Sequence, residues 1–309
     1  MKKYIIILFL SGMAFANTPP PDFKSFLLDD FCDACGCSAS GGGMGFSSMI
    51  DKNFIGLRYF NQSYSSRDGI FNDSPWIDEN FNTMQLWAKI PVLKKLQLSV
   101  QVPYHFHNRE LSSGNQSIEG LGDVTAIALY TLFQTHNDSV AIKHTLQGGV
   151  GIKAPTGKYN GENNGSVNPS FQLGTGSWDY LVAAEYVVRR KNLGLNAMAN
   201  YVIKTENDQQ YRFGNQINYA GTLFYMFEGK KFTIVPQAGI AGEIYAANKQ
   251  YNEEVPDTNG SVWFGKAGLE AGSGRFSVGV NAMLPIGQDL TGGRVEANYR
   301  WSVNLNYSL

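Results

Sequence analysis

Apolar and polar residues alternate along most of the chain beyond Asn53. From Val295 to Leu309 every second residue is apolar, and the residues between them are polar or charged. The same alternation recurs in 95–106, 193–204 and 275–286. Successive side chains of a β-strand point to opposite faces, so each segment predicts a strand with one apolar and one polar face.

Read in this way, the sequence predicts about twelve antiparallel strands. Most have ten or more residues, whereas strands of globular proteins average about 5–6, and a tilted strand needs about 9–11 to cross a bilayer. The predicted strands are 53–62, 80–91, 95–106, 122–133, 141–154, 178–189, 193–204, 213–227, 231–244, 261–271, 275–286 and 295–309.

The connections between these strands alternate in length. Three-residue turns are expected at 92–94, 190–192, 228–230 and 272–274, with a slightly longer one around 136–138. The longer connections are 63–79, 107–121, 155–177, 205–212, 245–260 and 287–294. A soluble sandwich also alternates but has no reason to sort its loops, whereas outer-membrane barrels have short periplasmic turns and long extracellular loops. The predicted fold is therefore an all-β, antiparallel transmembrane β-barrel.

Closure of this barrel is required on energetic grounds. An unpaired strand edge in lipid costs several kcal/mol for each free backbone group, so the last strand is expected to pair with the first. Twelve strands at the usual spacing and tilt leave a bore of about 10 Å or less once side chains point inward.

Three regions follow from the rest of the chain. Residues 1–16 have a basic start, the apolar run Tyr4–Leu10 and an Ala-x-Ala end, which predict a signal peptide for export. Residues 17–52 are rich in Pro, Gly and Cys and predict an irregular segment, either periplasmic or inserted into the barrel as a plug. Residues 53–309 form the predicted barrel in the outer membrane of a Gram-negative cell.

Composition agrees with a membrane barrel and excludes other classes. The 25 Lys and Arg residues balance 26 Asp and Glu, so the net charge of −1 argues against nucleic-acid binding. Only 17% of residues are charged, against about 25% in soluble domains. Aromatic residues make up 13% and there are 34 glycines, while mean hydropathy is −0.22. No apolar run reaches the ~20 residues of a membrane helix.

Cysteine and histidine offer the candidate chemistry. Cys32, Cys35 and Cys37 are close enough to bind a soft metal, to form one disulfide in an oxidising compartment, or to link to a partner. His105 and His107 share a face of one strand and, with Glu110, are a weaker metal candidate. His144 falls on an outward face, where a barrel lipase would need a serine partner, and none is placed for that role. No phosphate-binding loop or nucleophile elbow occurs, so neither an enzyme nor a cofactor is expected.

The inward face is expected to carry mixed charge. Its acids and bases predict internal salt bridges and a modest preference for anions, or they merely hydrate and knit the lumen. The candidate lumen residues are Arg58, Lys89, Lys153, Glu185, Lys266, Glu270 and Arg300, together with Lys95, Lys143, Lys204, Glu243 and Glu296.

Three glycine-containing motifs occur at strand ends: Gly120-Leu-Gly122-Asp123-Val, Gly151-Ile-Lys153-Ala-Pro155-Thr156-Gly157 and Gln172-Leu-Gly174-Thr175-Gly176-Ser-Trp-Asp179. In this order and spacing they resemble the outer-membrane family named for the meta-pathway of phenol degradation, over about 53–309. The resemblance implies a transport barrel for small compounds, aromatic ones among them. The motif residues either shape bends, with a salt-bridged cluster of Asp123, Lys153 and Asp179 near the mouth, or contact substrate. Leu309 departs from the aromatic residue that often ends such barrels.

The sequence therefore predicts an outer-membrane channel whose partners are lipid, small solutes and the barrel-assembly machinery. A structural or adhesion barrel is the main alternative, and a barrel enzyme is the third.

Overall fold

The structure is a computed structural model that describes residues 48–50, 53–69, 73–111, 113–135 and 141–309. The predicted signal peptide, most of the 17–52 segment, the three cysteines and the 136–138 turn lie outside the described residues. No helix in the described part of the chain is long and apolar enough to cross a membrane.

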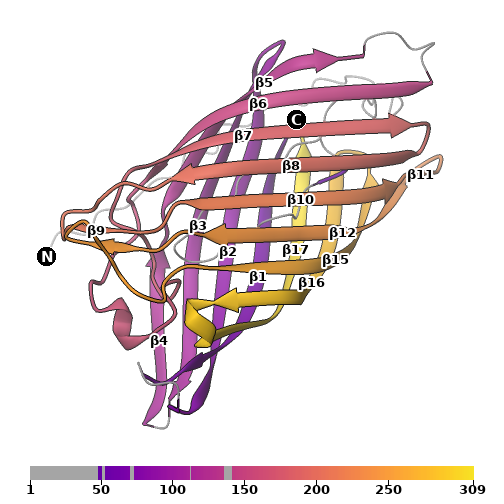
Figure 1. Ribbon diagram of the computed structural model, residues 1–309. Coiled ribbons are helices and arrows are strands. Elements are labelled where there is room, and N and C mark those ends of the chain that lie inside the picture. The colour runs from indigo at the N-terminus through magenta and orange to yellow at the C-terminus, as the bar shows by residue number, and fades with distance from the viewer. Residues whose placement is uncertain (1–47, 51–52, 70–72, 112, 136–140) are drawn as a thin grey trace, which may run out of the picture.

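Twelve long antiparallel strands close into a barrel, as the alternating pattern predicts. Each strand pairs with its neighbours in sequence, and β1 pairs with β17 from Phe54–Ser308 to Ser66–Val295, which closes the ring. In Figure 1 the strands β6 to β16 cross the front of the barrel, and β1, β2, β3 and β17 pass behind them at a steep angle. The barrel strands are β1 (Phe54–Arg67), β2 (Trp76–Leu93), β3 (Leu96–Leu111), β5 (Val124–Gln134), β6 (Ile142–Ala154), β7 (Asp179–Arg190), β8 (Leu193–Ile203), β10 (Gln216–Tyr225), β12 (Thr233–Tyr245), β15 (Gly260–Ser273), β16 (Phe276–Leu290) and β17 (Val295–Ser308).

The outer surface of the barrel is apolar. Large apolar side chains along every strand are exposed, such as Val280 at 52% and Leu305 at 49%, while the polar residues between them are buried. Exposed aromatic side chains gather at both ends of the strands, as in interfacial girdles. Those near the long loops are Trp76, Trp178, Tyr180, Tyr201, Trp263 and Tyr299, and those near the short turns are Tyr130, Phe133, Tyr225, Phe227, Phe232, Phe276 and Tyr307.

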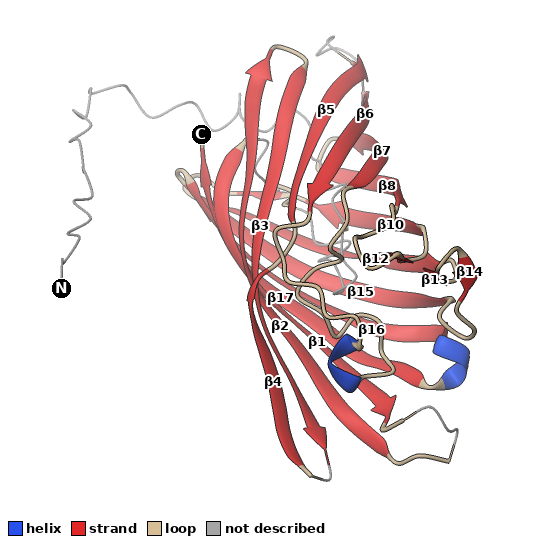
Figure 2. Cartoon of the chain, turned by 90° about the vertical axis from the view of Figure 1, so that its left-hand side faces the viewer, coloured by secondary structure: helices blue, strands red, loops and turns tan. Residues whose placement is uncertain are grey.

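Several segments expected to be loops are ordered strands. β3 continues to Leu111 and pairs with β4 (Gly114–Leu121), so 107–121 is a hairpin that extends the barrel wall, visible in Figure 2. β1 and β2 likewise extend into the predicted 63–79 loop. Short pieces β9 (Tyr211–Arg212), β13 (Lys249–Gln250) and β14 (Glu253–Glu254) form a small sheet in the long loops, and β11 (Phe227–Glu228) lies at the short-turn end. Two 3-10 turns, η1 (Asn163–Gly165) and η2 (Thr291–Gly293), complete the loop end.

Local irregularities explain where the predicted alternation was wrong. Asn298 has no partner in β1, because Ser63 pairs with Tyr299 and Tyr64 with Ala297. This bulge turns Val295 and Ala297 inward and leaves Glu296 exposed, contrary to its predicted lumen position. Lys95, also predicted to face the lumen, lies in the turn before β3 and is exposed.

Proline in mid-strand also has a local explanation. Pro236 in β12 lies between Ile234, which pairs with Phe227 of β11, and Gln237, which pairs with Phe224 of β10. The ladder is interrupted there, so the missing amide hydrogen costs no strand pairing on that side.

The lumen is less polar than the sequence suggested. Buried apolar side chains form a continuous cluster inside the barrel, and it reaches from β1 and β17 across to β5, β7 and β8. Its larger members are Tyr64, Phe81, Ile127, Leu129, Phe171, Leu181, Met198, Val202, Val262, Phe264, Met283, Leu290 and Val295. A small barrel fills its interior with side chains, and this one fills part of it with apolar ones.

Candidate functional site

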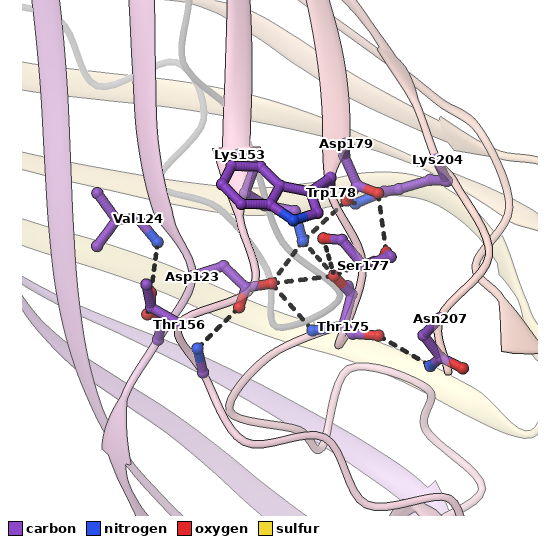
Figure 3. Close-up of polar contacts among 12 residues, drawn as sticks. Asp123, Val124, Lys153, Thr156, Thr175, Ser177, Trp178, Asp179, Lys204 and Asn207 are labelled. Atoms are coloured by element: carbon purple, nitrogen blue, oxygen red, sulfur yellow. Dashed lines mark hydrogen bonds and ion pairs between the residues drawn. The ribbon is translucent and has the colours of Figure 1, made fainter. Parts of the chain in front are cut away.

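The three sequence motifs meet at one place on the inner wall, at the long-loop end of β5, β6 and β7 (Figure 3). Lys153 Nζ lies 2.5 Å from Asp123 Oδ2 and 2.8 Å from Asp179 Oδ2. Lys204, which follows β8, reaches the same Asp179 oxygen at 3.1 Å. These four residues, called here the charged cluster, alternate in sign; Lys153, Asp179 and Lys204 are buried, and the Asp123 side chain is 8% exposed. The predicted salt-bridged cluster of Asp123, Lys153 and Asp179 is therefore present.

Asp123 fastens the loop that joins β6 to β7, residues 155–178. Its Oδ1 accepts a hydrogen bond from the Gly157 amide at 3.0 Å, and its Oδ2 accepts one from the Thr175 amide at 2.9 Å. The Thr175 hydroxyl contacts both Asp123 and Lys153. Asp123 thus joins residues near both ends of the loop to the start of β5.

Two motif glycines allow this closure. A Cβ atom on Gly157 would overlap the carbonyl oxygen of Leu173, and one on Gly174 would overlap Asp123 Oδ1 and the Gly157 carbonyl. Only glycine permits so close an approach of two backbones. Of the two interpretations of the motifs, the contacts favour the shaping of the loop.

The tip of the 155–178 loop is held by the β1–β4 side of the barrel. Glu79 of β2, fully buried, accepts hydrogen bonds from Ser166 Oγ at 2.5 Å and Asn168 Nδ2 at 3.0 Å. Arg109 and Gln116 donate to the Asn164 carbonyl oxygen at 2.8 and 3.0 Å. The loop therefore reaches across from β6 and β7 to β2, β3 and β4.

Aromatic contacts hold the second half of the 155–178 loop, which contains Phe171. Phe171 is fully buried, with its ring centroid 5.9 Å from that of Phe81, and the Arg109 guanidinium lies 5.2 Å from the Phe171 ring. Phe81 in turn packs on Tyr64 and His107. The loop is thus folded into the mouth and narrows it.

A small pocket, with a cavity volume of about 60 Å³ and partly open to solvent, lies between the loop tip and the opposite wall. One side is apolar, formed by Phe213, Val262, Leu290 and Val295, with Pro169 of the loop. The polar side includes Tyr64, Lys204, Tyr245 and Arg300. Its position makes it a space that a molecule entering past the loop would occupy.

On the polar side of this pocket, the charge of Arg300 is balanced by that of Glu243. Arg300 Nη1 and Nη2 lie 2.5 and 3.0 Å from the two oxygens of Glu243, a bidentate pair. Arg300 also donates to the Tyr64 hydroxyl at 2.6 Å, and the Tyr245 hydroxyl donates to Glu243. Two tyrosines and one ion pair thus form a rigid polar patch beside apolar walls.

An aromatic group continues outward from Phe213 of the pocket wall. Tyr159, Tyr211 and Phe213 pack with ring centroids 5.0–6.0 Å apart. Burial raises the pKa of the Tyr211 hydroxyl to about 12 and also raises the pKa of Tyr159. Both hydroxyls therefore remain neutral at physiological pH.

Five further predicted lumen residues, Arg58, Lys89, Glu185, Lys266 and Glu270, are buried inside the barrel but do not converge on one site. The Arg58 guanidinium stacks 3.6 Å from the Trp87 ring centroid, Glu185 accepts a hydrogen bond from Asn196, and Lys89 and Lys266 are buried. Glu270 contacts residues 48 and 49 near the short turns.

The histidines do not form a metal site with Glu110. His105 and His107 share the inward face, with ring centroids 4.8 Å apart, but Glu110 is exposed on the other face. Within the described residues, no group of three or more His, Cys, Asp or Glu side chains is placed to hold a metal. His144 lies on the outward face, and its Nδ1 is 2.6 Å from the Tyr186 hydroxyl.

Sequence reasoning missed Glu79, Arg109 and Phe171. Glu79 and Arg109 were assigned to loops, because Ile77 and Phe81 face inward there and obscure the usual apolar-out pattern. Had the second strand been predicted to begin at Trp76 instead of at 80, Glu79 would have been placed within it.

The fold and the lumen together define a transmembrane β-barrel of the outer-membrane type. A model of the family described as "Putative MetA-pathway of phenol degradation" matches residues 76–284, and the chain belongs to this family. The match spans β2 to most of β16 and contains all three motifs.

A solved structure of an outer-membrane channel shares the fold. The COG4313 outer membrane channel from Pseudomonas putida F1 is 14% identical with a TM-score of 0.64, covering 85% of this chain and 97% of that one. The β domain of the Bordetella autotransporter BrkA is 10% identical with a TM-score of 0.49, covering 84% and 100%. No curated protein sequence matches the chain.

Proposed function

We propose that the protein is an outer-membrane channel for small molecules that carry an apolar or aromatic group. The observation that carries the proposal is the pocket inside the closed barrel, between the tip of the 155–178 loop and the β15–β17 wall. Its apolar side continues into the cluster that crosses the lumen. The description of the family by a phenol-degradation pathway and of the P. putida neighbour as an outer membrane channel both support it.

The residues that line the pocket determine how a solute passes. A solute enters at the long-loop end and sheds water from its apolar part against Val262, Leu290 and Val295. Its polar substituent meets the hydroxyls of Tyr64 and Tyr245 and the edge of the Arg300–Glu243 pair. Because that pair is neutral overall, the pocket does not require a charged solute. Movement is downhill and needs no nucleotide.

Flux into proteoliposomes tests this function. The matched probes are phenyl β-glucoside and methyl β-glucoside, which share a sugar and differ in the aromatic ring. We expect both to enter, and we expect Val262→Asn to lower the entry of the phenyl glucoside relative to the methyl glucoside. Tyr251→Ser, on an exposed loop tip, is the control and leaves the ratio unchanged.

Three results would contradict the proposal. Exclusion of both glucosides and of smaller sugars by folded protein would leave the structural or adhesion barrel as the better description. An unchanged ratio in Val262→Asn would remove the pocket from the path. Loss of a measured hydrolytic activity in His144→Ala would point to the barrel enzyme.

A further inference from the structure

Exposed charge is sorted between the two ends of the barrel. In the part of the chain that the structure describes, seven of the eight exposed Lys and Arg side chains lie at the short-turn end. They are called here the basic rim and comprise the pairs Lys94–Lys95, Arg190–Lys191 and Lys230–Lys231, with Arg275. Of the thirteen exposed acids among the same residues, Glu228 alone lies at that end and twelve lie at the long-loop end. The two ends of the barrel therefore carry opposite charge.

The basic rim runs around the barrel instead of forming one patch. Its residues lie in the turns that join β2 to β3, β7 to β8, β11 to β12 and β15 to β16. In the strand order of the closed sheet these turns are spread over the whole circumference. A protein partner usually covers one continuous patch of about 800 Å² on one side of a molecule. A ring of charge instead matches a surface that surrounds the barrel, and a lipid leaflet is such a surface.

Each part of the basic rim lies next to the lipid-facing surface. Large apolar side chains that are 47–67% exposed occur within two residues of its cations in all four turns: Leu93, Leu193, Phe232 and Phe276. Arg275 donates a hydrogen bond to the hydroxyl of Tyr307 in the aromatic girdle at 3.2 Å, and its guanidinium lies 6.0 Å from that ring. Tyrosine marks the depth of the membrane interface, and Lys and Arg extend their charged ends from it on apolar stems. The rim therefore lies at the depth of the lipid headgroups.

We propose that the basic rim binds the phosphate groups of anionic phospholipids in the periplasmic leaflet. Neighbouring cations repel one another, so a ring of them is stabilised by an anionic surface at the same depth. Each Lys or Arg close to such a surface strengthens association about fivefold. The contact fixes the depth of the short-turn end in the bilayer and keeps the acidic loops on the other side. It goes beyond the proposed channel function and holds whether or not the lumen conducts.

The experiment compares urea unfolding of the barrel in vesicles of phosphatidylcholine alone and of phosphatidylcholine mixed with phosphatidylglycerol. We expect phosphatidylglycerol to raise the urea midpoint of wild type, and we expect salt at about 1 M to remove most of this gain. Lys230→Gln/Lys231→Gln should lower the gain, whereas Lys230→Arg/Lys231→Arg, which keeps the charge, should retain it. The matched control, Lys158→Gln/Tyr251→Glu, changes the net charge by the same amount on exposed loops at the other end and should also retain it.

Only the difference between the two lipids is compared, because the midpoint in phosphatidylcholine alone reports any general loss of barrel stability. Equal midpoints of wild type in the two lipids would overturn the proposal. Equal losses of the gain in the short-turn and loop variants would assign it to net charge and overturn the proposal as well. If phosphatidylglycerol has no effect and detergent-solubilised wild type sediments with isolated cell wall, but Lys230→Gln/Lys231→Gln does not, the rim binds an acidic polymer instead of lipid.

Discussion

At the residue scale, Asp123 determines the geometry of the mouth. It accepts amide hydrogen bonds from both ends of the 155–178 loop and pairs with Lys153. The contact of Asp123 with Lys153 and Asp179 was predictable, because the three motifs lie where adjacent strands begin or end, on the same rim of the barrel. The contribution of Glu79 was not predictable, because two of its donors, Ser166 and Asn168, come from a loop some 87 residues away.

Removal of Lys153 is expected to destabilise the barrel. Lys153→Met leaves Asp123 and Asp179 buried with one cation fewer, and breaking a buried pair costs about 3–5 kcal/mol of unfolding free energy. Denaturant unfolding in lipid vesicles measures the loss. Adding Asp123→Asn removes the unpaired charge and should restore part of the stability. Lys94→Met, in an exposed turn, is the control. If Lys153→Met unfolds at the same denaturant concentration as wild type, the charged cluster does not stabilise the barrel.

At the element scale, the 155–178 loop is the feature that converts an ordinary barrel into a constricted one. Twelve strands were predictable from alternation, within a few residues at most ends. The β3–β4 hairpin and the Asn298 bulge were not, because inward apolar residues break the rule that apolar side chains face lipid. The course of the loop depends on contacts with β2, β3 and β4, which no local pattern contains.

Release of the loop tip is expected to expose it to protease. Glu79→Ala removes the acceptor for Ser166 and Asn168, so the tip should detach from β2. Glu162 is exposed near that tip, and cleavage after it by a glutamate-specific protease should accelerate in the variant. Glu119→Ala, exposed on β4, should leave the rate unchanged. Equal cleavage rates in wild type and Glu79→Ala would show that Glu79 does not hold the loop.

At the scale of the whole molecule, the barrel has an apolar exterior and a mixed interior. The exterior follows directly from the period-two pattern, and the closure of β1 on β17 follows from the cost of an open edge in lipid. The apolar cluster in the lumen was not expected, and the proposed preference for solutes with apolar groups rests on it.

The exterior leads to a prediction about lipid contact. Val280→Arg introduces a charge on the exposed face of β16, and a charge at the bilayer midplane costs about 2–4 kcal/mol. Folding equilibria in vesicles should show this loss, whereas Tyr251→Arg on an extracellular loop tip should show little. If both variants fold with wild-type stability, β16 does not face acyl chains.

Single-channel recording of the folded wild-type protein in planar bilayers tests the central claim, that small molecules cross through the lumen, most directly. The predicted result is small, discrete conductance steps that become larger in Glu79→Ala, because that variant widens the mouth. Electrical silence in both proteins, with heat-modifiable barrels inserted in the bilayer, would contradict it.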